Sequence, residues 1–111
     1  MTLTAAALLL FLSALLEAGG DAIVRTGLHA SSALNRALLF VAGGLVLFAY
    51  GFVVNRPPWD FGKLLGVYVV FFFVVAQAIG WLFFGQPPSR GVWIGGALIV
   101  AGGVVVAMSA R

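Results

Sequence analysis

Four long apolar stretches, separated by short polar breaks, limit what this chain can fold into. Each stretch has about the 20 residues that a helix needs to cross a lipid bilayer. Two of the breaks carry tandem prolines, Pro57-Pro58 and Pro87-Pro88, which stop helices. No Lys or Arg precedes the first stretch, so we interpret it as a retained helix rather than a signal peptide. The predicted helices cover residues 3–24, 36–54, 63–84 and 93–110.

The breaks are short enough to join only neighbouring helices that run in opposite directions. The longest of them covers residues 25–35, which is the length of an ordinary helix–helix connection. The fold class expected for residues 1–111 is therefore an all-α integral membrane protein with a single domain. Its four transmembrane helices should form an up-down bundle with both termini on the same side of the membrane.

Composition and residue types exclude several functions. Apolar residues make up 63% of the chain and charged residues 8%, whereas about a quarter of the residues in soluble domains are charged. The basic residues are scattered singly, which is typical of anchoring at lipid headgroups and not of a nucleic-acid interface. With no cysteine and one histidine, His29, we expect no metal site and no cofactor. Ser13, His29 and Asp60 cannot meet as a catalytic group, so no enzyme is expected.

An acidic residue, Glu17, lies inside the first apolar stretch. At the helical rise it would sit about 5 Å from the middle of that stretch, where an acid costs about 3 kcal/mol to insert. Acids at such a depth usually face a bundle interior or an aqueous cavity and mark ion or proton pathways. We predict that Glu17 binds protons or a substrate. The alternative is that Glu17 is a structural acid whose hydrogen bonds are made by neighbouring groups.

Two further charged residues follow Glu17 at intervals of one helical turn. Asp21 and Arg25 continue the same face at i, i+4 spacing, so they can pair as a ladder toward the membrane edge. We predict that they form a gate or a secondary site beside Glu17.

The basic residues do not specify an orientation. If the N-terminus is cytoplasmic, three of the six Lys and Arg residues lie inside and three outside. The inside set is Arg56, Lys63 and Arg111, and the outside set is Arg25, Arg36 and Arg90. Because Lys/Arg asymmetry sets topology, this balance predicts dual insertion and an antiparallel dimer. Alternatively, the acid near Arg25 masks its charge and restores a weak preference for an outside N-terminus.

The fourth apolar stretch carries two adjacent stripes of small residues. Gly95 and Gly102 recur with Ser109 every seven residues, and Gly96 and Gly103 recur in the same way. In lipid, small residues allow helix backbones to approach closely and associate. We predict that the Gly95/Gly102 face is a dimer contact; the alternative is packing against the third helix of the same chain.

The third stretch contains two polar side chains, Tyr68 and Gln77. Tyr68 offers a ring face to a cation and a hydroxyl that can hydrogen-bond a carboxylate, both of which are useful beside Glu17. Its alternative is ordinary core packing. Gln77 is predicted to form a hydrogen bond between helices or to belong to a secondary site.

Several segments together resemble a known family. Leu-Glu-Ala-Gly-Gly at 16–20, Trp-Leu-Phe-Phe-Gly-Gln at 81–86 and the glycine-rich run at 94–103 are similar to the small multidrug resistance proteins of the drug/metabolite transporter superfamily. The run at 41–48, with Gly62-Lys63 and Tyr68, looks closest to the YnfA-like branch. The likeness spans the whole chain.

The resemblance implies an antiparallel homodimer in the inner (plasma) membrane of a prokaryote that exports small organic cations in exchange for protons. Glu17 falls on the family's membrane carboxylate, Tyr68 on an aromatic position of the substrate site, and Gly95 and Gly102 on dimer glycines. Two expected aromatics are replaced by Leu65 and Gly43, so planar dyes should bind weakly. The alternatives are a lipid-carrier flippase subunit of the same superfamily and a small structural or regulatory membrane subunit.

Overall fold

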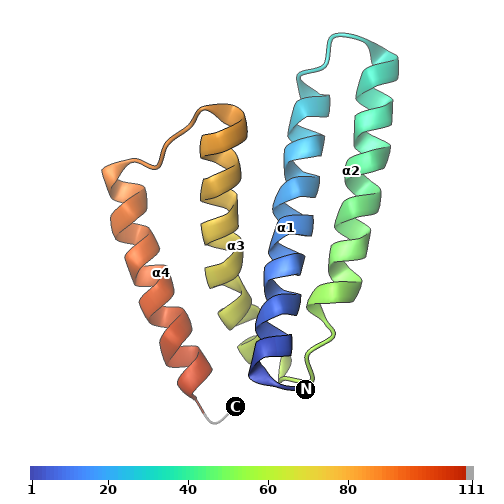
Figure 1. Ribbon diagram of the computed structural model, residues 1–111. Helices are drawn as coiled ribbons and strands as arrows, with labels where there is room; N and C mark the ends of the chain where they lie inside the picture. The colour runs from blue at the N-terminus through green and yellow to red at the C-terminus, as the bar shows by residue number, and fades with distance from the viewer. Residues whose placement is uncertain (110–111) are drawn as a thin grey trace.

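The structure is a computed structural model that describes residues 1–109, and it contains four α-helices joined by short connections (Figure 1). All four have the length and hydropathy of membrane spans. The prediction of an all-α, four-span membrane protein is therefore confirmed. The helices are α1 (Leu3–Leu28), α2 (Ala33–Val54), α3 (Phe61–Phe84) and α4 (Arg90–Met108).

The predicted helix boundaries were wrong by up to one turn, mainly at the connection between the first two helices. The prediction placed residues 25–35 outside helices, but α1 continues to Leu28 and α2 already begins at Ala33. The Ser32 hydroxyl caps α2 by accepting the Asn35 N–H at 3.1 Å. Such polar caps begin a helix before its apolar run begins. The predicted end of the fourth helix, residue 110, lies outside the described residues.

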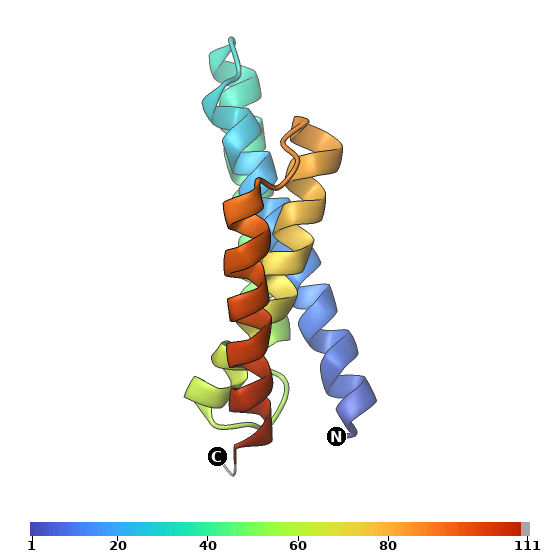
Figure 2. The ribbon, with the colours of Figure 1, turned by 90° about the vertical axis from the view of Figure 1, so that its left-hand side faces the viewer.

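The four helices lie side by side in the order α4, α3, α1, α2 (Figure 1), and the edge-on view shows that this row is thin (Figure 2). The dimensions of the chain are 51 × 34 × 19 Å. Successive helices run in opposite directions, and the start of α1 lies at the same end as the end of α4 (Figure 1). The expected up-down connectivity is present, with α2 and α4 at the outer edges of the row.

Close backbone approach joins α1 to α2. A Cβ added at Gly20 would lie 2.8 Å from Leu47 Cγ and 3.3 Å from the Gly43 carbonyl oxygen, which is too close for any side chain. A Cβ at Gly27 would lie 2.9 Å from the Phe40 ring. Small residues at these positions let the two helices pack tightly, as in other membrane helix pairs. This packing places the C-terminal half of α2 near Glu17, where Tyr50 contacts Tyr68.

The outer faces of the row are apolar and exposed. Leu82 and Val105, for example, are 78% and 69% exposed, and so are many other large apolar side chains. A bilayer covers such faces. The small buried core lies where α1, α2 and α3 meet, and it surrounds the site described next. Its buried members are Leu10, Ala14, Ala18, Val54, Leu64, Tyr68 and Val75.

Candidate functional site

A hydrogen bond between Glu17 and Tyr68 lies at the centre of the site. The Tyr68 hydroxyl donates to Glu17 Oε1 at 2.8 Å. Glu17 comes from α1 and is half-buried, whereas Tyr68 comes from α3 and is only 4% exposed. The two residues that the sequence assigned to the substrate site are therefore in direct contact.

Tyr50 of α2, which no sequence pattern singled out, also lies beside this pair. Its ring centroid lies 5.7 Å from that of Tyr68, which holds the Glu17 carboxylate. The Phe72 ring centroid lies 6.2 Å from that of Tyr68. Tyr50 from α2 and Phe72 from α3 thus both pack near the tyrosine that holds the carboxylate. The chain has only two tyrosines, and a second hydroxyl in an apolar run was the available signal.

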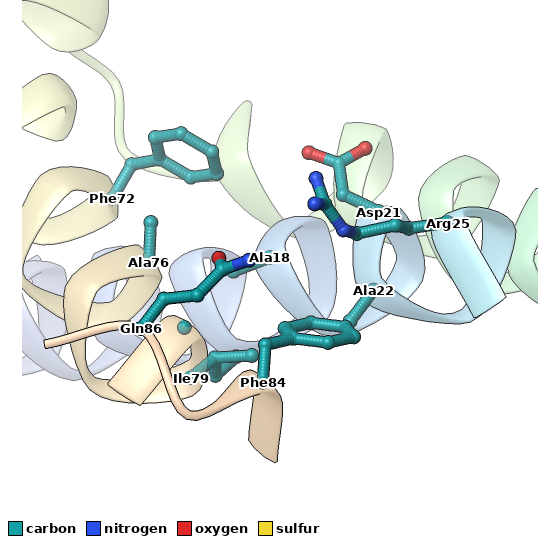
Figure 3. Close-up of a pocket in the computed structure, with 10 residues that line it drawn as sticks. Ala18, Asp21, Ala22, Arg25, Phe72, Ala76, Ile79, Phe84 and Gln86 are labelled. Atoms are coloured by element: carbon teal, nitrogen blue, oxygen red, sulfur yellow. The ribbon is translucent and has the colours of Figure 1, made fainter. Parts of the chain in front are cut away.

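Asp21 and Arg25 line a groove of about 260 Å³ between α1 and α3. Figure 3 shows both side chains projecting from α1 to the same side of the groove, with Phe84 and Gln86 entering from the end of α3. The Arg25 guanidinium carbon lies 5.4 Å from the Phe84 ring centroid, which is a cation–π contact. In residues 1–109 no ion pair joins Asp21 to Arg25. Small side chains on both helices, including Ala18, Ala22 and Ala76, leave the groove open.

Gln77 lies away from Glu17 and Tyr68. It lines a separate, largely apolar cavity of about 230 Å³ between α3 and α4, together with Trp81 and Trp93. Nine residues separate Gln77 from Tyr68 on α3, so the helical period turns the two side chains toward different neighbours. The structure thus does not bring Gln77 together with the other residues proposed from sequence.

The two glycine stripes of α4 face different surroundings. A Cβ at Gly96 would lie 2.5 Å from the Phe73 ring, and one at Gly103 would collide with Val70, so this stripe packs on α3. No atom lies within 4 Å of a Cβ at Gly95 or Gly102 in the described part of the chain. The Gly95/Gly102 stripe is therefore the one left open along the edge of the row.

The whole length of the chain matches a known family. The sequence model described as "Uncharacterised BCR, YnfA/UPF0060 family" matches residues 3–111. The chain belongs to the YnfA/UPF0060 family. This membership confirms the closest resemblance seen in the sequence, and bacterial members of the YnfA/UPF0060 family support a multi-pass membrane protein. No solved structure gives a significant match.

Curated relatives from three bacteria show the extent of the similarity. A UPF0060 membrane protein of Herpetosiphon aurantiacus is 32% identical over 104 residues, which cover 91% of each chain. One from Nocardia farcinica is 34% identical over 113 residues, with 100% of this chain and 98% of the relative covered. The Bacillus subtilis UPF0060 membrane protein YfjF is 31% identical over 106 residues, covering 94% of each chain. These matches extend over nearly the full length of all three relatives.

Proposed function

We propose that the chain is a proton-coupled exporter of small organic cations and that the YnfA/UPF0060 family is a branch of the small multidrug resistance proteins. One observation carries the proposal: a half-buried carboxylate deep within a membrane span, held by a tyrosine hydroxyl at 2.8 Å. Such a group binds a proton or a cation, but not both at once. Exchange of one for the other follows from that exclusion.

The groups around Glu17 are suited to a positively charged ligand. In a cavity of low dielectric constant an anionic carboxylate selects positive charge. The partly buried rings of Tyr50 and Phe72, which pack beside Tyr68, offer faces to a cation, and each such contact contributes about 0.5–2 kcal/mol depending on desolvation. Leu65 and Gly43 stand where two further aromatics were expected, so small or medium cations should bind better than large planar dyes that need stacking.

We further propose that the transporter is an antiparallel homodimer. Four helices in a thin row cannot enclose a water-accessible path, and α4 lies at the edge with its Gly95/Gly102 stripe open. Two copies in opposite orientation reproduce the inverted repeat that alternating access uses. The even distribution of Lys and Arg permits both insertions. In this arrangement the cation binds between the two Glu17 carboxylates.

Electrical recording from proteoliposomes tests the transport proposal. The panel runs from guanidinium and small quaternary amines to polyaromatic dyes, and a labelled anionic lipid-phosphate carrier serves as the counter-case. We expect proton-coupled currents with the small cations and weak currents with the dyes. Movement of the lipid carrier with no cation current would instead support the flippase alternative. If neither moves, the structural-subunit alternative stands and transport is refuted.

Asp21→Asn is expected to slow transport without abolishing it. Asp21 lines the groove next to the Glu17 site and does not touch Tyr68, so its charge assists the approach of a cation rather than its exchange for a proton. Initial rates of cation flux, measured at saturating and subsaturating substrate, should show the larger effect at low concentration. A loss as complete as that of Glu17→Gln would move the proton site to Asp21.

Tyr50→Leu is expected to weaken cation binding by about 2- to 30-fold, the range that corresponds to one lost cation–π contact. Tyr50→Phe is the matched control, because it keeps the ring and removes only the hydroxyl. Calorimetric titration of the purified protein with a quaternary amine measures both variants. If the two substitutions weaken binding equally, the hydroxyl and not the ring of Tyr50 contributes to the site.

A further inference from the structure

A second cavity lies at the membrane edge, where α1 and α3 end and α2 begins. Its volume is about 890 Å³, within the range of about 300–1,000 Å³ that is usual for ligand sites. The apolar part of its wall includes Leu38 and Phe84, and the polar part comes from Arg25, Thr26, His29, Ser31, Asn35 and Gln86. This cavity is separate from the Glu17 site, although it shares Arg25, Phe84 and Gln86 with the neighbouring groove.

Among the residues that line this cavity, Arg25 carries the charge, while the carboxylate of Asp21 lines the neighbouring groove that Arg25 also borders. Arg25 lines it directly, and none of the three acidic residues of the chain does. Arg36 adds a second guanidinium group at the same hairpin, where it donates to the Ala30 carbonyl at 3.2 Å. Asn35, Gln86 and the exposed His29 add hydrogen-bonding groups. The cavity is therefore complementary to a single anionic group.

The location of the cavity indicates which anion fits it. Span ends lie at headgroup level in a bilayer, and basic pockets between transmembrane helices bind anionic lipid headgroups. The side chains of Leu38 and Phe84 continue the wall toward the apolar part of the spans. A ligand with a phosphate at one end and an acyl chain at the other would satisfy both parts of the wall.

We propose that this cavity binds the phosphate headgroup of an anionic phospholipid, with Arg25 as its principal charge. The C-terminal ends of α1 and α3 border the cavity and disfavour an anion, whereas the first turn of α2 borders it too and favours one, so the helix dipoles oppose each other. Binding consequently depends on the guanidinium of Arg25, which can face the phosphate from its position over Phe84. Arg25 would then contact the lipid headgroup while also lining the neighbouring groove.

Native mass spectrometry of the full-length protein, released from detergent with equal amounts of phosphatidylglycerol and phosphatidylcholine, tests this inference. We expect preferential retention of phosphatidylglycerol. Arg25→Gln should lower that preference by about fivefold, which corresponds to about 1 kcal/mol for one basic residue near the lipid. Arg25→Lys should retain most of it. Arg90→Gln is the matched control, because it removes the same charge near the same end of α3 without touching the cavity.

Three results would overturn the inference. Equal retention of the two lipids would remove the preference for an anion. Equal losses from Arg25→Gln and Arg90→Gln would reduce the effect to general surface charge. Retention of glycerol phosphate or inorganic phosphate as strong as that of phosphatidylglycerol would make this a site for soluble phosphate. If Arg25→Gln does not fold, His29→Ala takes its place and should lower the preference in the same comparison.

Discussion

Glu17→Gln abolishes proton-coupled cation transport and leaves the four helices folded, if the account of the site is correct. Glutamine has nearly the shape of glutamate, and its amide oxygen can still accept the Tyr68 hydroxyl, so the contact at 2.8 Å survives. What the amide lacks is the ability to take up or release a proton. Coupled currents in proteoliposomes should fall to the level of empty liposomes.

The control for this experiment is Glu17→Asp, which keeps a carboxyl group but withdraws it from Tyr68 by one methylene. We expect it to retain measurable coupling at a lower rate. Circular dichroism and detergent gel filtration establish that each variant is folded. Unchanged coupled flux in well-folded Glu17→Gln would show that the proton is carried elsewhere.

Gly102→Leu is expected to disrupt the dimer and Gly103→Leu to destabilise the monomer, although the two glycines are adjacent in the sequence. Gly102 belongs to the open stripe, so leucine there should leave the monomer folded and prevent two copies from approaching closely. Gly103 packs on Val70 of α3, so leucine there overfills a contact within one chain. Overpacking of this kind typically costs about 1–3 kcal/mol.

Two measurements separate these effects. Crosslinking in the membrane, followed by gel filtration, should show that Gly102→Leu is monomeric with a thermal unfolding midpoint close to that of the wild type. Gly103→Leu should lower the unfolding midpoint. A dimer that persists in Gly102→Leu would contradict the proposed contact on α4. Reporter fusions at the C-terminus complete the test, because signal from one side of the membrane alone contradicts dual insertion.

The number and approximate extent of the helices followed from the sequence because spans of about 20 apolar residues interrupted by proline leave few alternatives. The boundaries did not follow as well. Ser32 and Ser89 cap α2 and α4 from positions just before the first helical residue, and Gly27 extends α1 because it packs on Phe40. Hydropathy does not register caps, and the contact of Gly27 depends on the partner helix.

The site was predicted in part. The depth of Glu17 indicated that it needs a polar neighbour, and Tyr68 was one candidate with core packing as the alternative; the structure shows both the hydrogen bond and the burial. Tyr50 was not predicted, because its place beside Tyr68 depends on the register between α1 and α2. Close backbone contact between Gly20 and Gly43 sets that register. Periodicity alone located both glycine stripes of α4, but it could not determine which of them packs on α3.

The pH dependence of cation binding tests the central claim most directly. If Glu17 holds either a proton or a cation, the two compete, and the apparent Kd for a quaternary amine must rise as the pH falls through the range in which Glu17 takes up its proton. The limiting slope is about tenfold per pH unit. Calorimetric titrations of the wild type and of Asp21→Asn should both show this rise. A Kd independent of pH in the wild type, or a slope lost in Asp21→Asn, would contradict the assignment to Glu17.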